Sequence, residues 1–227
     1  MFAINHAATA LVVKKRFPQV PMPWLLLSVQ CVEILWVLFN YLGWEKTTTD
    51  VTVTSIADIH LAYMPYSHSI VTSLVIAALA WVVLSRFLNK PIAAVAVAIA
   101  ILSHIALDLL THTQDIAVMP FVETGKLGLG FYQLPVLAFF VETVYGLFCW
   151  YIFGGNMALF AVILLCNLAN VSFFVAAIRG PEVLMAGHPL WIVTAIALQI
   201  VVTLSLVGCF SRDRSTLFAN GVAGANN

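Results

Sequence analysis

Long runs of apolar residues, each bounded by turn-forming or charged positions, dominate the hydrophobic pattern of the chain. A helix needs about 20 consecutive, mostly apolar residues to cross the hydrocarbon core of a membrane. Six windows meet this requirement: residues 22–43, 67–88, 91–111, 128–153, 156–178 and 188–208. The pattern therefore predicts an all-α, polytopic membrane protein with about six transmembrane helices.

A shorter apolar segment precedes these windows and ends in the basic cluster Lys14, Lys15 and Arg16, before the turn-forming sequence PQVPMP. If the cluster marks the membrane surface, a helix rising about 1.5 Å per residue carries His6 roughly 12 to 15 Å into the bilayer. We therefore expect an N-terminal half-helix, for which an amphipathic helix on the membrane surface is an equally good alternative. Because the positive charges follow the apolar residues, we expect no cleavable signal peptide.

Basic residues are distributed unequally between the predicted connections. Six spans would put both termini on one side of the membrane. Seven basic residues then share that side, and three lie on the other: Lys14, Lys15, Arg16, Arg86, Lys90, Arg212 and Arg214 against Lys46, Lys126 and Arg179. Connections rich in Lys and Arg stay in the cytoplasm, so both termini are predicted to be cytoplasmic. The two longest connections, residues 44–66 and 113–127, then face outward as candidate lids or entrances.

The composition agrees with a membrane protein and limits what else the chain can hold. Hydrophobic residues make up 62% of the chain and charged residues 9%, with a mean hydropathy of +1.01. Soluble domains are roughly 25% charged. We expect a single membrane domain over residues 1–210, with a metal-site core in residues 1–150, and a disordered cytoplasmic tail over residues 211–227.

The charge balance argues against a nucleic-acid-binding protein, and the cysteine spacing argues against a zinc site built from paired cysteines. Ten basic residues match ten acidic ones, so nothing provides the basic surface that nucleic acid requires. The four cysteines lie in apolar segments without paired spacing and are interpreted as small apolar fillers. The expected partners are the lipid bilayer and a small-molecule or lipid substrate; the oligomeric state stays open.

One predicted helix carries a stripe of ionisable side chains. In SHIALDLLTH, His104, Asp108 and His112 recur every four residues, which keeps all three on one helix face. A His and Asp pair at this spacing can bind a single metal ion. His104 and His112 lie about 12 Å apart along the axis, too far to share one ion. Either the site holds more than one metal, or His112 lies at its mouth.

Other ionisable residues are predicted at a similar depth. Glu33 lies about 16 Å above Met22 and Glu142 about 10 Å below Pro135, while His68 lies at the outer start of its span. Asp58 and His60 could reach down from the preceding loop. A charged group inside hydrocarbon costs roughly 3 kcal/mol on insertion scales, and no Lys or Arg is predicted in this layer. A cation is therefore the expected partner.

These residues predict one buried metal site near the outer half of the bilayer. The expected ligands are His6, Glu33, His68, His104, Asp108 and His112. Three acids, Glu33, Asp58 and Glu142, are candidates for the catalytic base or for a supporting role, with no choice among them.

Several blocks of the sequence resemble, in order, those of a bacterial family of uncharacterised membrane proteins. The blocks are NHAATALVVKKRFP, QCVEILW, YMPYSHS, SHIALDLLTH, and GLGFYQLP followed by Glu142. The family looks related to the LexA-regulated, membrane-bound predicted metal-dependent hydrolases. It is in turn distantly similar to zinc-dependent phospholipase C and to zinc-dependent single-strand nucleases. The likeness covers residues 1 to about 150; the last third matches only as hydrophobic helices.

The resemblance has its own implications for the site. It makes His6, His68, His104, Asp108 and His112 the metal ligands, with Asp108 a candidate bridge between ions, and it implies a bacterial inner (cytoplasmic) membrane. The relatives generally carry Asp where this chain has Glu33, and a longer acid reaches a metal differently. Whether Asp58 takes the role of the family's loop acid is open.

Together these observations favour a membrane-embedded metal-dependent hydrolase that acts on a phosphoester or lipid-like substrate through a metal-activated water. A divalent transition metal, zinc in the first place, is the expected cofactor, and manganese or iron fits the ligand types nearly as well. Two or three ions would suit the reaction, and their number stays open. A permease or ion-coupled transporter could use the same cluster, although no internal repeat is visible. A non-catalytic membrane subunit with a structural metal is the third hypothesis.

Overall fold

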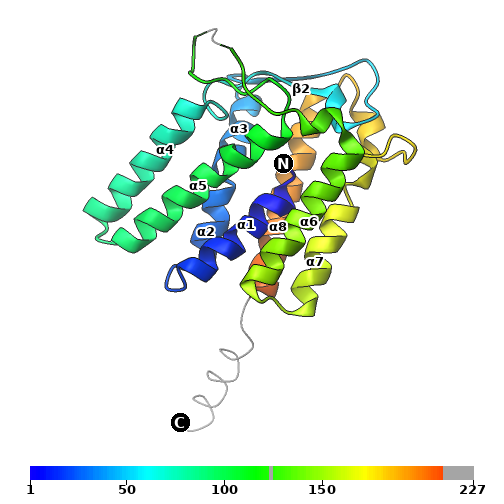
Figure 1. Ribbon diagram of the computed structural model, residues 1–227. Helices are drawn as coiled ribbons and strands as arrows, with labels where there is room; N and C mark the ends of the chain where they lie inside the picture. Colours follow the sequence, from blue (N-terminus) through cyan, green and yellow to red (C-terminus); the bar gives the residue numbers. More distant parts are fainter. Residues whose placement is uncertain (123–124, 212–227) are drawn as a thin grey trace.

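The computed structural model describes residues 1–122 and 125–211, which form an all-α polytopic bundle (Figure 1). Four helices in the described part are long and apolar enough to cross a membrane. They are α4 (Ile70–Val82) with its π-helical continuation η2 (Val83–Phe87), α5 (Pro91–Thr111), α6 (Pro135–Phe153) and α8 (Pro189–Phe210). The pair α2 (Met22–Val29) and α3 (Cys31–Tyr41) passes the same test together but is bent by 52°. The all-α, polytopic prediction is confirmed, with four or five spans instead of six.

The predicted span over residues 156–178 is wrong. Its helix, α7 (Met157–Leu168), has 12 residues and is about 18 Å long, against a hydrocarbon core of roughly 30 Å. Near the end of this helix, the side-chain amide of Asn167 donates to the carbonyl of Ile163, and that of Asn170 donates to the carbonyl of Cys166. The chain then turns through the 3₁₀ helix η4 (Val171–Phe173).

The bend between α2 and α3 lies at Gln30, inside the predicted span 22–43. The hydroxyl of Ser28 donates to the carbonyl of Trp24. The side chain of Gln30 donates to the carbonyl of Ala3 instead of facing lipid. Side chains that insert into the backbone ladder are a common cause of helix kinks. The kink leaves the Val29 carbonyl at the bend, where it meets a side chain of α5.

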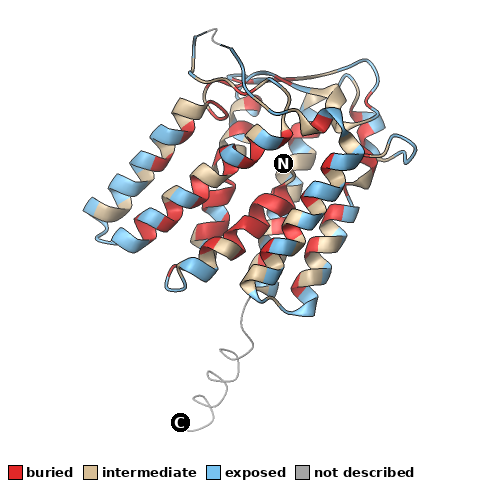
Figure 2. Ribbon diagram, in the orientation of Figure 1, coloured by how far each residue is buried: buried red, intermediate tan, exposed pale blue. Residues whose placement is uncertain are grey.

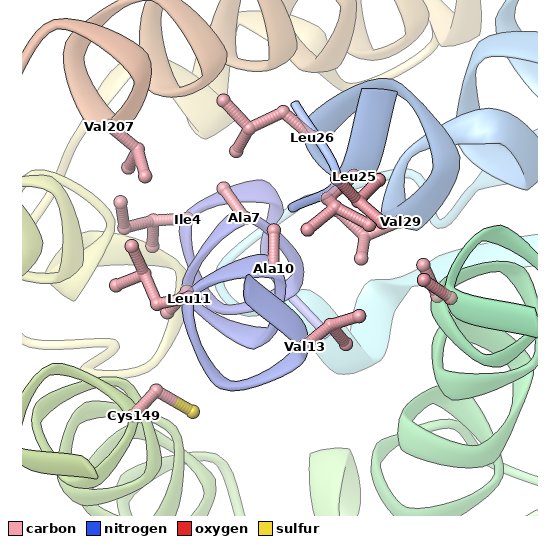
Figure 3. Packing of buried hydrophobic residues seen from close by; sticks show 14 of the residues in the cluster. Ile4, Ala7, Ala10, Leu11, Val13, Leu25, Leu26, Val29, Cys149 and Val207 are labelled. Atoms are coloured by element: carbon pink, nitrogen blue, oxygen red, sulfur yellow. The ribbon is translucent and has the colours of Figure 1, made fainter. Parts of the chain in front are cut away.

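Helix α1 (Ala3–Arg16) occupies the centre of the bundle, and its residues from Ala3 to Leu11 are all buried (Figure 2). It packs against α2, α5, α6 and α8. Figure 3 shows Ala7 and Ala10 facing leucines of α2, with Val207 of α8 and Cys149 of α6 around the same helix. Small side chains allow helix backbones to approach closely inside a membrane. The half-helix is confirmed, and the alternative of a surface helix is wrong.

Loops and short elements cover the end of the bundle opposite the α4–α5 connection (Figure 1). The 44–66 connection forms a two-stranded antiparallel hairpin of β1 (Lys46–Thr49) and β2 (Ile59–Tyr63), with the 3₁₀ helix η1 (Ile56–Asp58) between them. The 3₁₀ helices η3 (Phe131–Gln133) and η5 (Pro181–Met185) belong to the other connections. The predicted disordered tail lies outside the described residues, except for Ser211.

Candidate metal centre

Four side chains from three parts of the fold meet inside the bundle. Glu33 comes from α3, His68 from the segment before α4, and His104 and Asp108 from α5. One potential ligand atom from each lies within 4.8 Å of the other three. We call Glu33, His68, His104 and Asp108 the central cluster.

Nitrogen and oxygen atoms face each other across the central cluster. Nε2 of His104 lies 3.0 Å from Oδ2 of Asp108 and 3.4 Å from Oε2 of Glu33. Nε2 of His68 lies 3.2 Å from the same Glu33 oxygen and 3.7 Å from Oδ2 of Asp108. The two imidazoles therefore point their Nε2 atoms at the two carboxylates.

The backbone bend at Gln30 orients His104. Nδ1 of His104 lies 2.7 Å from the carbonyl of Val29, the last residue of α2. A carbonyl only accepts, so this nitrogen carries the proton and donates. In the neutral imidazole Nε2 then holds a free lone pair, which faces Asp108 and Glu33. A continuous helix through Gln30 would use the Val29 carbonyl within its own ladder.

Two facing atoms of the central cluster have no hydrogen-bond partner in the described part of the chain. They are Nε2 of His104 and Oδ2 of Asp108, both buried, and both ring nitrogens of His6 share this condition. An unprotonated nitrogen and a carboxylate oxygen both carry lone pairs and repel each other at 3.0 Å. A positive charge between or on them relieves the repulsion, and a divalent cation does so for all four side chains.

A second group of atoms surrounds the other oxygen of Asp108. Nε2 of His6 lies 3.2 Å from Oδ1, and Nε2 of His112 lies 3.9 Å from it. The amino group of Met1 donates to Oδ1 at 2.6 Å and to the hydroxyl of Thr111 at 3.0 Å. The two oxygens of Asp108 thus face different partners. The amino group also brings a positive charge that the sequence analysis did not count.

Asp115 belongs to this second group, although sequence reasoning missed it. Its Oδ2 lies 3.5 Å from Nδ1 of His112. A carboxylate behind the second ring nitrogen is a common way to orient a metal-binding histidine. Asp115 lies in the turn that follows α5, which ends at Thr111, so the helical spacing of the polar stripe does not extend to it.

Glu142 lies beside the start of α1, where several donors reach it. Its carboxylate accepts from the backbone N–H of Phe2 at 3.0 Å, from Nδ2 of Asn5 at 2.8 Å and from the hydroxyl of Tyr132 at 3.0 Å. Helix α1 has no side-chain cap of its own. Glu142 therefore supplies the missing acceptor at this buried helix start.

Asp58 lies in the hairpin connection, and no contact joins it to the central cluster among the described residues. Its Oδ2 accepts from the backbone N–H and the hydroxyl of Thr54 at 2.7 and 2.9 Å and from the N–H of Ser55 at 2.9 Å. Burial alone would raise the pKa of Asp58, but these hydrogen bonds hold it below its usual value. His60 is exposed and pairs with Asp50.

A cavity reaches the centre from the end of the bundle that carries the loops. His6, Glu33, His68, His112 and Asp115 line one part of it. The remaining wall is mostly apolar: Phe2, Trp36, Leu61, Phe173, Met185 and Ile192. Half of these apolar residues come from the last third of the chain, which the sequence analysis treated only as hydrophobic helices. The cavity therefore joins a polar, acid-rich end to an apolar wall.

Comparisons of the chain with protein-family models, with curated proteins and with solved structures each found no match. The fold and the central cluster define a membrane protein with a buried group of side chains able to hold a metal ion.

Proposed function

We propose that the protein is a membrane-embedded, metal-dependent hydrolase. The observation that carries the proposal is the facing pair of buried, unpartnered atoms, Nε2 of His104 and Oδ2 of Asp108, with Glu33 and His68 beside them. A buried polar atom without a partner costs about 1–3 kcal/mol. A divalent cation offsets this cost for both atoms at once. Imidazole and carboxylate ligands suit zinc, and manganese or iron fits nearly as well.

A second ion is part of the proposal because the two oxygens of Asp108 face different histidines. The central cluster would hold one ion on the Oδ2 side of Asp108, and His6 with His112 would hold another on the Oδ1 side, in place of the Met1 amino group that donates to this oxygen. A carboxylate that bridges two ions is in line with the family resemblance described above. Paired ions suit hydrolysis of a phosphoester because they stabilise both the attacking and the leaving oxygen.

The cavity supports catalysis over a purely structural metal. A structural site is closed by protein ligands, whereas a catalytic site keeps a position open to substrate. Glu33 and His68 both line the cavity, so a substrate can reach their side of the cluster. A bound metal supplies a Lewis acid and lowers the pKa of water. Glu33 is the candidate base that lies in the cluster itself, because Asp58 and Glu142 use their carboxylates elsewhere.

The apolar wall supports a lipid-like substrate. A phosphate head group suits the cation-binding end of the cavity, and a hydrocarbon chain suits the wall formed by residues such as Trp36, Phe173 and Met185. Contact with these side chains removes hydrocarbon from water and contributes about 0.8 kcal/mol for each buried CH₂ group. We therefore propose an amphiphilic phosphoester as the substrate class.

The 52° bend between α2 and α3 favours one competing function, an ion-coupled transporter. Broken helices at membrane depth form the ion sites of many transporters. In that case Glu33, three residues beyond the bend, and the histidines of the central cluster would alternately bind the transported proton or cation.

The test is the metal content of the protein purified in detergent, together with His104→Ala and Asp108→Ala. His188→Ala is the matched control, since His188 is exposed and stacks on Trp191 away from the centre. We expect at least one transition metal per chain in the wild type and in the control, and a loss in the two variants. Hydrolysis of generic and lipid phosphoesters should follow metal content. Well-folded wild-type protein without metal would overturn the proposal, and proton-coupled transport in vesicles without hydrolysis would favour the transporter.

A further inference from the structure

A chain of buried hydrogen bonds approaches the central cluster from behind His68. Oε2 of Glu45 accepts from the hydroxyl of Ser67 at 2.6 Å, and the same Ser67 oxygen lies 2.8 Å from Nδ1 of His68. Glu45, Ser67 and His68 are 3%, 0% and 2% exposed, so water does not compete for these bonds. Glu45 lies in the loop before β1 and was not singled out by the sequence.

The direction of the protons follows from the donor and acceptor capacities of the three groups. A carboxylate only accepts, and a serine hydroxyl has a single proton to donate. That proton points to Glu45, so the Ser67 oxygen must accept from Nδ1–H of His68. The proton of the neutral imidazole therefore sits on Nδ1, and the lone pair of Nε2 faces Glu33 and Asp108.

We propose that Glu45 is a positioning residue of the metal centre, which acts through Ser67 to keep the proton of His68 on Nδ1 and its Nε2 available as a ligand. The inference rests on the metal centre of the proposed function. Groups that hold the second nitrogen of a ligating histidine fix its tautomer and raise its basicity, and their loss costs about 10–100-fold in metal affinity.

Glu45 has a separate structural role, which uses its other oxygen. Oε1 accepts from the backbone N–H groups of Tyr66 and Ser67 at 2.9 and 2.8 Å and so fixes the segment that leads into α4. Glu45→Gln separates the two roles. Its amide oxygen can keep both backbone bonds, while its NH₂ group replaces Oε2 and donates to Ser67. The Ser67 hydroxyl must then turn to His68, which favours the proton on Nε2, where a ligand needs a lone pair.

Glu182→Gln is a matched control. Glu182, in η5, is 1% exposed and accepts from the hydroxyl of Ser172 and from the backbone N–H of Gly180. Among the described residues this second arrangement contains no histidine. Ser67→Ala is a second test variant, because it removes the relay and leaves both Oε1 contacts of Glu45 in place.

The experiment measures zinc affinity by competition with a chelator, and the unfolding temperature of the metal-free protein. We expect Glu45→Gln and Ser67→Ala to bind zinc about 10–100-fold more weakly. The metal-free unfolding temperature of Glu45→Gln and the affinity of Glu182→Gln should both stay close to wild type. Nitrogen-15 NMR of histidine-labelled protein, with His68→Ala for assignment, should show a proton on Nδ1 of His68 in the wild type and its loss in Glu45→Gln.

The readouts separate this inference from the proposed function. Wild-type protein that binds no metal would overturn the proposed metal site. The NMR measurement on metal-free protein would still test whether the Glu45–Ser67 hydrogen bonds keep the proton of His68 on Nδ1. The role of Glu45 would be overturned if the wild type binds zinc and both Glu45→Gln and Ser67→Ala bind it equally well. It would also be overturned if His68 keeps its Nδ1 proton in Glu45→Gln. If Glu45→Gln does not fold, Ser67→Ala decides by its affinity.

Discussion

The imidazole rings of His6 and His104 lie stacked, with centroids 3.8 Å apart and an angle of 13° between their planes. One ring comes from the half-helix α1 and the other from α5, and both have a nitrogen close to Asp108. His6 can take this position because α1 starts inside the bundle, beside the centre. The packing of α1 should therefore control the site as well as the stability of the fold.

Gly146 lets α6 approach α1, and its substitution should show this dependence. A Cβ atom at Gly146 would lie 2.5 Å from Oδ1 of Asn5 and 3.0 Å from Cγ2 of Ile163. We expect Gly146→Ala to destabilise the protein by about 1–3 kcal/mol, as overpacking does in cores, and to weaken metal binding through His6. Thermal unfolding in detergent measures the first effect and chelator competition the second.

Gly208→Ala is the control for this substitution. Gly208 also lies in a membrane helix, but the nearest atom to its added Cβ would be Cδ1 of Leu26 at 3.4 Å. The change should be neutral or slightly stabilising because Ala is the better helix former. Equal unfolding temperatures for the two variants would contradict the close contact of α1 and α6.

Glu142 should prove to be an anchor for α1, and Glu142→Ala tests this. The change leaves the N–H of Phe2, Nδ2 of Asn5 and the hydroxyl of Tyr132 without their acceptor, and each unsatisfied buried group costs about 1–3 kcal/mol. We expect a lower unfolding temperature and a loss of metal. Tyr132→Phe, which removes one donor only, should have a smaller effect. A Glu142→Ala protein of normal stability that has lost only hydrolysis would instead make Glu142 the base.

The sequence predicted the elements that local patterns encode. The His104 and Asp108 pair on α5 and the short apolar helix that ends in Arg16 can both be read from residue spacing. His112, expected on the same helix face, is instead the residue just past the end of α5. The failed span over residues 156–178 shows the limit of this reasoning. Its composition is apolar throughout, but Asn167 and Asn170 satisfy backbone carbonyls, and the helix ends between them. A hydropathy window does not detect side chains that hydrogen-bond to the backbone and end a helix.

The parts of the site that sequence reasoning missed depend on tertiary structure. Glu45 lies 23 positions before His68, in a loop whose path the pattern does not predict. The apolar wall needs residues of η4, η5 and α8 to line the same cavity as Trp36 of α3, and no spacing in those segments indicates this. The bend at Gln30 is another example, because the partner of the Val29 carbonyl is His104 on a helix 75 positions away.

Removing the metal should destabilise the protein. A ligand that binds only the native state stabilises it by about 2.7 kcal/mol when its concentration is 100 times the Kd. We expect a strong chelator to lower the unfolding temperature of the wild type and added zinc to restore it. His104→Ala should unfold at nearly the same temperature with and without chelator. If neither chelator nor zinc changes the unfolding temperature of the wild type, a tightly bound ion is contradicted.

The basic residues at the ends of the helices should lie in the cytoplasm. The C-terminal end of α1 and the α4–α5 connection share one end of the bundle, and the hairpin lies at the other (Figure 1). In a cysteine-free background, Val51→Cys in the hairpin connection should react with a membrane-impermeant reagent from outside the cell. Gln19→Cys, in the turn after α1, should react only after permeabilisation. The reverse labelling pattern would invert the orientation given by the positive-inside rule.

The three residues of the α5 stripe should respond differently to truncation. His104 and Asp108 are 0% and 1% exposed and face each other in the central cluster, so His104→Ala or Asp108→Ala leaves an under-ligated ion in a low-dielectric site. Both variants should lose metal, stability and hydrolysis. His112 is partly exposed and approaches only the other oxygen of Asp108, at 3.9 Å. His112→Ala should therefore remove at most part of the metal and leave the protein folded. Metal stoichiometry, thermal unfolding and phosphoester hydrolysis, measured on all three variants, decide this. Unchanged metal content in all three, with lost proton-coupled transport in reconstituted vesicles, would instead identify the stripe as a proton relay.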